Sequence, residues 1–382
     1  MPGFETINQK ELNQLKKIFT VGRGVLFRSG FDKLRGKSFQ VSDFEKKFAK
    51  KFRSKYALAV SSGTAALRVA LASLGVDKND EVITQSFTFV ATVEAIIESG
   101  AKPICTEIDD TLNMCPEDLI KKITNKTKVV ILVHMLGSPG YVNKIRNICK
   151  RRKIFLIEDT AWGIGGKFNN KFLGTLGEIG TFSFDFAKTI TTGEGGMLLF
   201  SKKKYFLKAK AWHDHGHENN PSVPRWEDTR SSSGFNFRMT ELQGAVGISQ
   251  LNKFNDIFKK HKKNRDKIIN KLKKFKNIKL RKYPKNCKDA PESLIFSFKN
   301  KDLAKKFRQR LLKKGYSTKI LPEAITWHFA GKWGHMKELD LKKNNFFKKS
   351  KNYLDKFVSL QIFYNMDKKY PLAIEQTIKE IT

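Results

Sequence analysis

Hydrophobic positions follow two alternating patterns between about residues 40 and 250. In some segments they recur every three to four residues, and in others they form short apolar runs. The first pattern predicts amphipathic helices and the second predicts buried strands. The expected helices span 41–52, with Ser42 as N-cap, and 63–74, 89–99, 116–123, 141–152 and 240–254. The expected strands span 56–61, 81–85, 103–107, 128–134, 154–158 and 197–200. This alternation predicts an α/β fold with a mostly parallel sheet between helices.

The composition changes beyond about residue 256, where lysine-rich helices dominate. A βαβ-like unit is expected there, around a strand at 293–298 and a helix at 303–314. We therefore expect two domains. Residues 1–255 would form an N-terminal segment and a large domain, and residues 256–382 a smaller C-terminal α+β domain.

The chain carries a formal net charge of +37, from 74 lysines and arginines against 37 aspartates and glutamates. Such an excess ordinarily points to a nucleic-acid partner. Here the excess is mostly lysine and is spread along the whole length. No arginine patch is interleaved with aromatic residues, as a base-stacking surface needs. We expect a solvated basic surface and no nucleic-acid partner, and a basic nucleic-acid-binding protein is the alternative from another class.

The cysteines and the apolar runs bear on the compartment and on metal binding. Four scattered cysteines show no CxxC pair and no zinc spacing, which predicts reduced thiols and no metal. No apolar run approaches the roughly 20 residues of a membrane span. The N-terminus lacks the charged-then-apolar order of a signal peptide. We expect a cytoplasmic protein without a membrane partner.

Lys188 is notable for its setting. A strand with alternating phenylalanines, residues 182–186, leads to it, and a turn rich in threonine and glycine, residues 191–196, follows. A lysine that is fixed at the mouth of a sheet and partly desolvated has a lowered pKa, which makes it a Schiff-base nucleophile. The ordinary alternative is a solvated lysine at a strand end.

Ser62, Gly63 and Thr64 lie where an expected strand gives way to a helix. Small residues at this point let backbone N–H groups approach a phosphate, and the two hydroxyls add donors. Ser183, five residues before Lys188, adds another hydroxyl. The same run also suits an ordinary helix cap, so it is a weak sign of a phosphate site when taken alone.

Asp159 ends an apolar strand. An ionised acid there would keep a pyridine nitrogen protonated, so that the ring accepts electrons, although strand-end acids also bind metals and nucleotides. Phe87 and Phe89 follow another strand end, where an aromatic ring can stack on a planar cofactor or simply pack in the core. Together with Lys188 and residues 62–64, these positions predict pyridoxal 5'-phosphate as the cofactor.

Residues 55–250 resemble the DegT/DnrJ/EryC1/StrS family of sugar aminotransferases. The matching runs are 62–67, 88–92, 158–159, 182–184 with Lys188, 192–196 and 234–243. The Lys-x-x-Thr-Thr-Gly-Glu-Gly-Gly pattern and the last run are strong family signatures. The resemblance implies fold type I (aspartate-aminotransferase-like), with a mostly parallel seven-stranded sheet in the large domain. It also implies a pyridoxal-phosphate-dependent transaminase.

The resemblance assigns roles to the matching residues. Lys188 would form the Schiff base and shuttle protons, Asp159 would pair with the pyridinium nitrogen, and Phe89 would stack on the ring. The residues that would hold the phosphate are Ser62, Gly63, Thr64 and Ser183. Asn236 would reach the phosphate of the neighbouring subunit, which implies a homodimer with shared active sites.

One position departs from the family pattern. Members usually carry glutamine or histidine three residues after the aspartate, near the phenolic oxygen of the cofactor, whereas this chain has Trp162. An indole N–H can donate there, but the ring also narrows the pocket and makes it more apolar. The related dehydratases carry histidine in place of Lys188, so Lys188 favours an aminotransferase.

Three histidines alternate within residues 212–221. On an extended strand they would point the same way and suit zinc, yet Gly216 and the Asn-Asn-Pro run at 219–221 favour a loop. The family has a His-Gly pair here, near the substrate, so we expect contact with an anionic sugar. The expected substrate residues are His134, His213, His215, His217, Arg225 and Arg230.

With Trp162, this run resembles the family branch that aminates carbon 8 of a 3-deoxy-octulosonic acid for lipopolysaccharide. The acceptor would then be 8-dehydro-3-deoxy-octulosonate, the product 8-amino-3,8-dideoxy-octulosonate, and the amino donor L-glutamate. A nucleotide-linked 4-keto-6-deoxy sugar is the alternative acceptor.

Overall fold

The computed structural model describes residues 3–36, 38–220, 222–322, 325–339, 341 and 346–381. The helices are α1 Gln9–Thr20, α2 Gln40–Phe52, α3 Gly63–Ser73, α4 Val90–Ile97, α5 Pro116–Lys122, α6 Val142–Arg152, α7 Lys203–Trp212, α8 Glu241–Leu272, α9 Lys301–Lys313, α10 Ile325–His328, α11 Lys348–Leu354 and α12 Tyr370–Lys379. The strands are β1 Tyr56–Val60, β2 Glu81–Gln85, β3 Lys102–Thr106, β4 Thr127–Val133, β5 Phe155–Asp159, β6 Lys167–Phe168, β7 Lys171–Phe172, β8 Ile179–Ser183, β9 Gly196–Phe200, β10 Lys279–Leu280, β11 Cys287–Lys288, β12 Ser293–Ser297 and β13 Phe357–Gln361.

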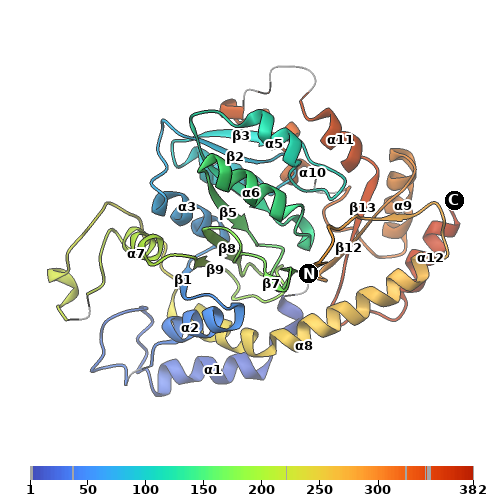
Figure 1. Cartoon of the computed structure of the whole chain (residues 1–382). Helices are drawn as coiled ribbons and strands as arrows, with labels where there is room; N and C mark the ends of the chain where they lie inside the picture. Colours follow the sequence, from blue (N-terminus) through green and yellow to red (C-terminus); the bar gives the residue numbers. More distant parts are fainter. Residues whose placement is uncertain are drawn as a thin grey trace.

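The central sheet has seven strands in the order β1-β9-β8-β5-β4-β2-β3 (Figure 1). Strand β9 runs antiparallel to both of its neighbours, and the remaining strands are parallel to one another. Two three-stranded sheets, β10-β12-β13 and β11-β6-β7, complete the strands. The predicted α/β fold with a mostly parallel seven-stranded sheet is confirmed.

Alternating side chains of the strands bury two different cores, which explains why both faces of the sheet carry helices. On β1, Leu58 and Val60 pack with α3 and α7, whereas Ala57 and Ala59 pack with α2 and α8. Farther along the sheet, β4 and β5 turn a second row of apolar side chains toward α5 and α6. A strand with both faces covered reads as a continuous apolar run, as β4 does.

Helix α8 begins at a capping box formed by Thr240 and Gln243 and continues unbroken to Leu272. It runs along the base of the large sheet and ends beside the small sheet β10-β12-β13 (Figure 1). There its last turns join a separate core with β12, β13, α9 and α12. The expected domain boundary at 255/256 falls inside this helix, and the division into two domains stays a prediction. No helix within the described ranges is long and apolar enough to cross a membrane.

The start of α2 is held by a carboxylate from α8. Its N-cap is Phe39, so the expected cap at Ser42 was wrong. Phe39 offers no side-chain acceptor; instead, Glu241 accepts the N–H groups of Gln40 (2.5 Å) and Val41 (3.2 Å). The same carboxylate pairs with Arg35 at 2.8 Å, and both side chains are buried. One ionised group therefore caps α2 and ties it to α8.

Replacing Glu241 by glutamine is expected to lower the free energy of unfolding by about 3–5 kcal/mol, because it leaves the Arg35 guanidinium buried without a counter-charge. Urea unfolding followed by circular dichroism measures the change. Asp43→Asn is the matched control, because Asp43 pairs with Lys46 on the exposed side of α2. That variant is expected to lose less than about 1 kcal/mol. An equal loss in both variants would contradict the assignment.

The N-terminal segment packs against the loop that carries Lys188. A Cβ atom added to Gly3 would lie 2.6 Å from the backbone oxygen of Lys188, so only glycine fits there. The Thr6 hydroxyl donates to Gln250 of α8 at 3.0 Å, and Gln250 also accepts the N–H of Thr191 at 3.5 Å. The segment, the loop and α8 are thus joined through one amide side chain.

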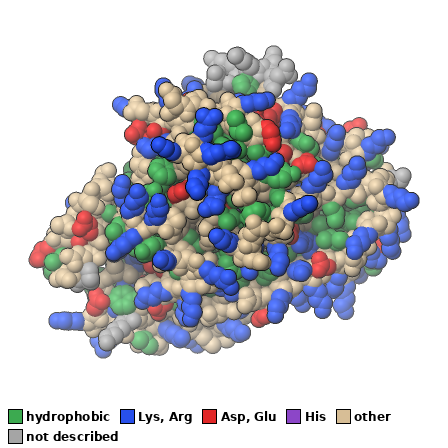
Figure 2. Space-filling model, viewed as in Figure 1, with side chains coloured by type: hydrophobic (Ala, Val, Ile, Leu, Met, Phe, Trp, Pro, Cys, Tyr) green, Lys and Arg blue, Asp and Glu red, His purple; other side chains and the backbone are tan. Residues whose placement is uncertain are grey.

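Lysine and arginine side chains are distributed over the whole face seen in Figure 2, with acidic side chains between them. They do not gather into one patch on this face. This distribution is consistent with the expected solvated basic surface, and the expectation of no nucleic-acid partner stays a prediction.

Candidate active site

A cavity of about 440 Å³ lies at the carboxyl ends of the parallel strands of the large sheet. Parallel sheets bind ligands at this edge, and the volume is within the roughly 300–1,000 Å³ of small-molecule sites. Eight of the residues predicted from the sequence to bind the cofactor line it: Ser62, Gly63, Thr64, Phe89, Asp159, Trp162, Ser183 and Lys188. Sequence motifs spread over more than a hundred positions thus meet in one cavity.

The N-terminus of α3 meets the end of β8 at one side of the cavity. Ser62 caps the helix, its Oγ accepting the N–H of Ala65 at 3.0 Å. A Cβ atom added to Gly63 would lie 2.7 Å from the Cβ of Ser183, so the two elements touch here because residue 63 has no side chain. Free N–H groups and the positive end of the helix dipole suit a phosphate group. These residues therefore fit the phosphate of pyridoxal phosphate.

Replacing Gly63 by alanine is expected to weaken cofactor binding about tenfold or more, because the new methyl group displaces Ser183 from this corner. Titration of the full chain with pyridoxal phosphate, followed by absorbance, measures the dissociation constant. Gly334→Ala is the matched control, since a Cβ atom there meets nothing within 4 Å. An unchanged dissociation constant for Gly63→Ala would show that the phosphate binds elsewhere.

Asp159 ends β5 with its carboxylate buried in the cavity wall. One oxygen accepts the N–H of Ala161 at 3.1 Å and the other accepts the hydroxyl of Thr92 at 3.2 Å. The Thr92 hydroxyl in turn lies 2.8 Å from that of Thr88. Burial raises the pKa of Asp159, and a cationic partner would favour its ionised form. A protonated pyridine nitrogen is such a partner.

Lys188 lies between β8 and β9, with only 8% of its surface exposed. Its Nζ is 3.3 Å from the centroid of the Trp162 ring. Burial lowers the pKa of Lys188 to about 8, and the acids Glu292 and Asp185 partly oppose this change. A substantial fraction of the amine is therefore neutral near pH 8 and able to act as a nucleophile.

A segment from the C-terminal part of the chain forms another wall. Thr88 donates its N–H to the carbonyl of His328 at 3.0 Å, and His328 lines the cavity. Phe89, which is 38% exposed, lies nearly parallel to the ring of Trp327, with centroids 6.5 Å apart. Phe87, by contrast, is fully buried in the core. Of these two phenylalanines, Phe89 is the one that lines the cavity and can stack on a ligand.

The structure corrects the expected substrate contact at His134. This side chain is fully buried and does not line the cavity. Its Nε2 lies 2.9 Å from Glu158, whose carboxylate also accepts the N–H groups of Gly174, Leu176 and Gly177. Burial would raise the pKa of Glu158, but these contacts hold it below its usual range. His134 thus helps to anchor the end of β5, behind Asp159.

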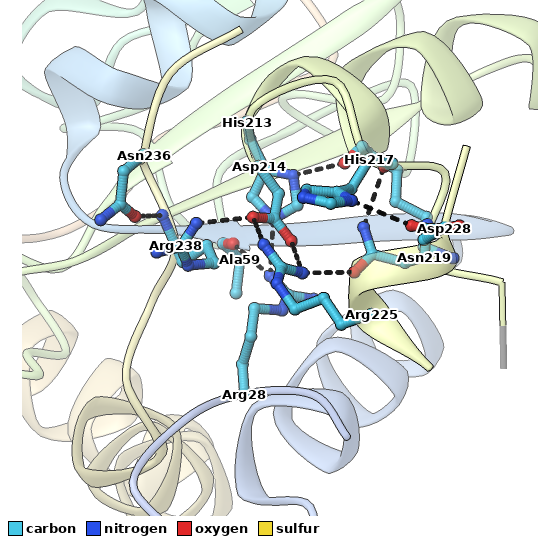
Figure 3. Close-up of polar contacts among 11 residues, drawn as sticks. Arg28, Ala59, His213, Asp214, His217, Asn219, Arg225, Asp228, Asn236 and Arg238 are labelled. Carbon is cyan, nitrogen blue, oxygen red and sulfur yellow. Dashed lines mark hydrogen bonds and ion pairs between the residues drawn. The ribbon is translucent and has the colours of Figure 1, made fainter. Parts of the chain in front are cut away.

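The loop between α7 and α8 is organised around Asp214 (Figure 3). The carboxylate of Asp214 accepts two hydrogen bonds from Arg225, at 2.8 and 2.5 Å, and one from Arg238 at 2.5 Å. Burial alone would raise the pKa of Asp214, but the two guanidinium groups hold it well below its usual range. Arg225 therefore already has a carboxylate partner within the chain, which it shares with Arg238.

The histidines of this loop point to different partners (Figure 3). His213 lies 3.0 Å from Arg28 and 2.6 Å from the carbonyl of Lys210, and burial lowers its pKa to about 3. His217 pairs with Asp228 at 3.3 Å. None of the expected substrate residues of this loop lines the cavity of its own chain; these are His213, His215, His217, Arg225 and Arg230.

Asn236 also lies outside the cavity of its own chain, exposed and 3.4 Å from the N–H of Arg238 (Figure 3). Its expected contact with the phosphate of a neighbouring subunit stays a prediction. A larger groove of about 1080 Å³, between α11 and the small sheet, contains none of the residues expected from the sequence. The chemistry is therefore assigned to the smaller cavity.

Among the residues at the site that sequence reasoning missed are Thr92 and His328. Thr92 stood in a matching run, and its position one turn after Phe89 in α4 was a usable signal. No sequence signal pointed to His328, because its position at the cavity depends on the backbone pairing of Phe329 with Phe87.

Fold and cavity together define a pyridoxal-phosphate-dependent aminotransferase of fold type I. The chain belongs to the DegT/DnrJ/EryC1/StrS aminotransferase family, whose model matches residues 28–378. A match of this extent makes it a sugar aminotransferase that uses pyridoxal phosphate. The cavity around Lys188 is therefore the candidate active site of an enzyme of this class.

The relatives of the chain include a sugar-nucleotide synthase, a dehydratase and a solved aminotransferase. GDP-perosamine synthase of Escherichia coli O157:H7 is 38% identical over 253 residues, which cover 64% of this chain and 68% of the relative. GDP-4-keto-6-deoxy-D-mannose 3-dehydratase of Escherichia coli O55:H7 is 32% identical over 252 residues, covering 61% and 65%. The solved aminotransferase from Psychrobacter cryohalolentis superposes with a TM-score of 0.86 at 24% identity, covering 98% of this chain and 97% of its own.

Proposed function

We propose that the chain moves the amino group of an amino acid, L-glutamate, to the carbonyl carbon of a keto or aldehyde sugar. The observation that carries this proposal is the buried amine of Lys188 in a cavity that also holds Asp159 and the N-terminus of α3. Relatives in the family include a dehydratase. Lys188 favours amine transfer, because the dehydratases of the family carry histidine at this position.

Each residue of the cavity has a separate task. When bound, pyridoxal phosphate supplies an aldehyde that combines with amines and a ring that accepts electrons. Ser62, Gly63, Thr64 and Ser183 would bind its phosphate. Asp159 would hold a proton on the ring nitrogen, and Phe89 would keep the ring in plane by stacking. Lys188 would hold the aldehyde until the amino donor replaces it there, and its released Nζ would then take up and return protons.

Two acceptors are supported by different observations. Trp162 in the cavity wall, where relatives usually carry glutamine or histidine, supports 8-dehydro-3-deoxy-octulosonate and a place in lipopolysaccharide synthesis. Arg230 is exposed and lies outside the cavity of its own chain, so in a homodimer it would offer a positive charge to the carboxylate of this sugar in the neighbouring cavity. The relative named as GDP-perosamine synthase supports a nucleotide-linked 4-keto-6-deoxy sugar instead.

The test is an acceptor screen. The full chain is loaded with pyridoxamine phosphate, and each sugar is added with and without a linked nucleotide. Transfer of the amine restores the absorbance of the pyridoxal form. Reaction with the octulosonate aldehyde supports the first acceptor, and reaction with nucleotide-linked keto sugars alone supports the second. A loaded enzyme that reacts with no sugar carbonyl would contradict the proposed function.

The homodimer and the compartment are also proposals. Large apolar side chains remain exposed next to the loop of Asp214 and in the N-terminal segment: Phe19, Phe31, Trp226 and Phe235. A second copy of the chain would cover them and would bring Asn236 to the neighbouring cavity, and light scattering measures the mass. The four cysteines are free thiols, which suits the reducing cytoplasm.

A further inference from the structure

A second buried lysine lies beside the cavity. Lys319 follows α9 and is 7% exposed at its side chain; its Nζ is 4.6 Å from the centroid of the same Trp162 ring that Lys188 contacts. Neither the sequence patterns nor the matching family runs single it out. Its ammonium group is therefore a charge that the proposed function has not used.

Glu292 holds Lys319 in place. The two groups are 3.1 Å apart, and the carboxylate is almost completely buried. The other oxygen of Glu292 accepts the hydroxyl of Thr189 at 3.4 Å, and Thr189 directly follows Lys188 in the chain. The ion pair is thus connected to Lys188 in two ways: Lys319 contacts the same Trp162 ring, and Glu292 binds the adjacent residue Thr189.

Lys188 is surrounded by five charged groups from four parts of the fold. They are Asp159 of β5, Asp185 and Glu194 of the β8–β9 turn, Glu292 before β12 and Lys319 after α9. Among these acids Glu292 has the largest effect on Lys188, and it raises the pKa, whereas Lys319 lowers it. The two partners of the ion pair therefore act on Lys188 in opposite directions.

We propose that Lys319 and Glu292 are positioning residues that set how much of Lys188 is neutral, with the ring of Trp162 as the contact that Lys188 and Lys319 share. The proposal rests on the proposed function, because it assigns Lys188 the role of the reacting amine. When both partners are present, the effect of Lys319 on Lys188 partly offsets that of Glu292. If either partner of the ion pair is replaced, the other is left as an unpaired buried charge next to Lys188.

The experiment measures the titration of Lys188 directly. Loading the full chain with pyridoxamine phosphate leaves the Lys188 amine free to react. Trace labelling with acetic anhydride from pH 6 to 11, read by peptide mass spectrometry, gives the titration of each lysine. The variants are Lys319→Met, Glu292→Gln and the double variant, and the matched control is Lys282→Met, which breaks the exposed pair with Asp110.

Lys319→Met is expected to reduce the neutral fraction of Lys188 at pH 7 about tenfold, because Glu292 is left bare. Glu292→Gln is expected to increase that fraction several-fold. The double variant is expected to lie closer to the wild type than either single variant, and Lys282→Met to match the wild type. The pH at which amine transfer reaches half its maximal rate should move in the same direction as the labelling.

An unchanged titration of Lys188 in folded Lys319→Met and Glu292→Gln would overturn the proposal. If Lys319→Met does not fold, Glu292→Gln decides alone, and a titration that does not move to lower pH overturns it. Borohydride reduction of the wild-type holoenzyme keeps the two proposals apart. If the cofactor is not fixed on Lys188, the proposed function fails, whatever the labelling shows.

Discussion

Replacing Lys188 by alanine is expected to reduce amine transfer by about 10⁴-fold or more. The loss is large because one side chain serves both as the nucleophile and as the group that moves protons. No other lysine lines the cavity in the described part of the chain, and Lys319 beside it is paired with Glu292. Steady-state rates with L-glutamate and the best acceptor of the screen measure the effect.

Lys171→Ala is the matched control, because Lys171 is an exposed strand lysine on β7, away from the cavity. It is expected to keep the wild-type rate. Borohydride treatment provides a second readout, since the cofactor should become fixed on the wild type and not on Lys188→Ala. A Lys188→Ala variant that still transfers amines at a tenth of the wild-type rate would refute the role assigned to this residue.

The second large effect is expected for Asp159→Asn, with a fall in the rate of about 10³-fold. The amide has the shape of the carboxylate and keeps its place next to Thr92, but it carries no charge to hold a proton on the ring nitrogen. The ring then accepts electrons poorly. Because the phosphate contacts are untouched, cofactor content should stay close to that of the wild type.

Asp80→Asn serves as the control for Asp159→Asn. Asp80 pairs with Lys128 and directly precedes β2, at the opposite edge of the sheet. The Asp80→Asn variant should transfer amines at the wild-type rate. If Asp159→Asn loses cofactor in proportion to its rate, the carboxylate acts in binding and not through the ring nitrogen.

Local sequence patterns were enough to predict most of the sheet and the core of the site. The expected strand 81–85 coincides with β2. The runs around Ser62, Asp159 and Lys188 each include the residues that form the local turn or end the local strand. These features depend on a few neighbouring residues. Because parallel strands end at the same edge of a sheet, correct strand ends also predict that the side chains meet.

The predictions were wrong where the position or length of an element depends on contacts with a distant part of the chain. The expected strand 182–186 lies at 179–183, since its pairing with β9 and β5 fixes the register. Helix α8 extends to Leu272, well beyond the expected end at 254, because its last turns pack on the small sheet. Helices α1 and α7 were not expected at all, although Asn8 and Glu11 form a capping box that marks the start of α1. His328, Lys319 and Glu292 reach the site only through tertiary contacts.

The close approach of Gly3 to the backbone of Lys188 has a practical consequence for producing the enzyme. An affinity tag fused ahead of Gly3 would leave the fold directly beside the catalytic loop. Any displacement of Gly3 would disturb the Thr6–Gln250–Thr191 hydrogen bonds that hold this loop. α12 ends on the far side of the small sheet, away from this loop (Figure 1). Purification handles therefore belong at the C-terminus, and a cleavable N-terminal tag should be removed before any rate is measured.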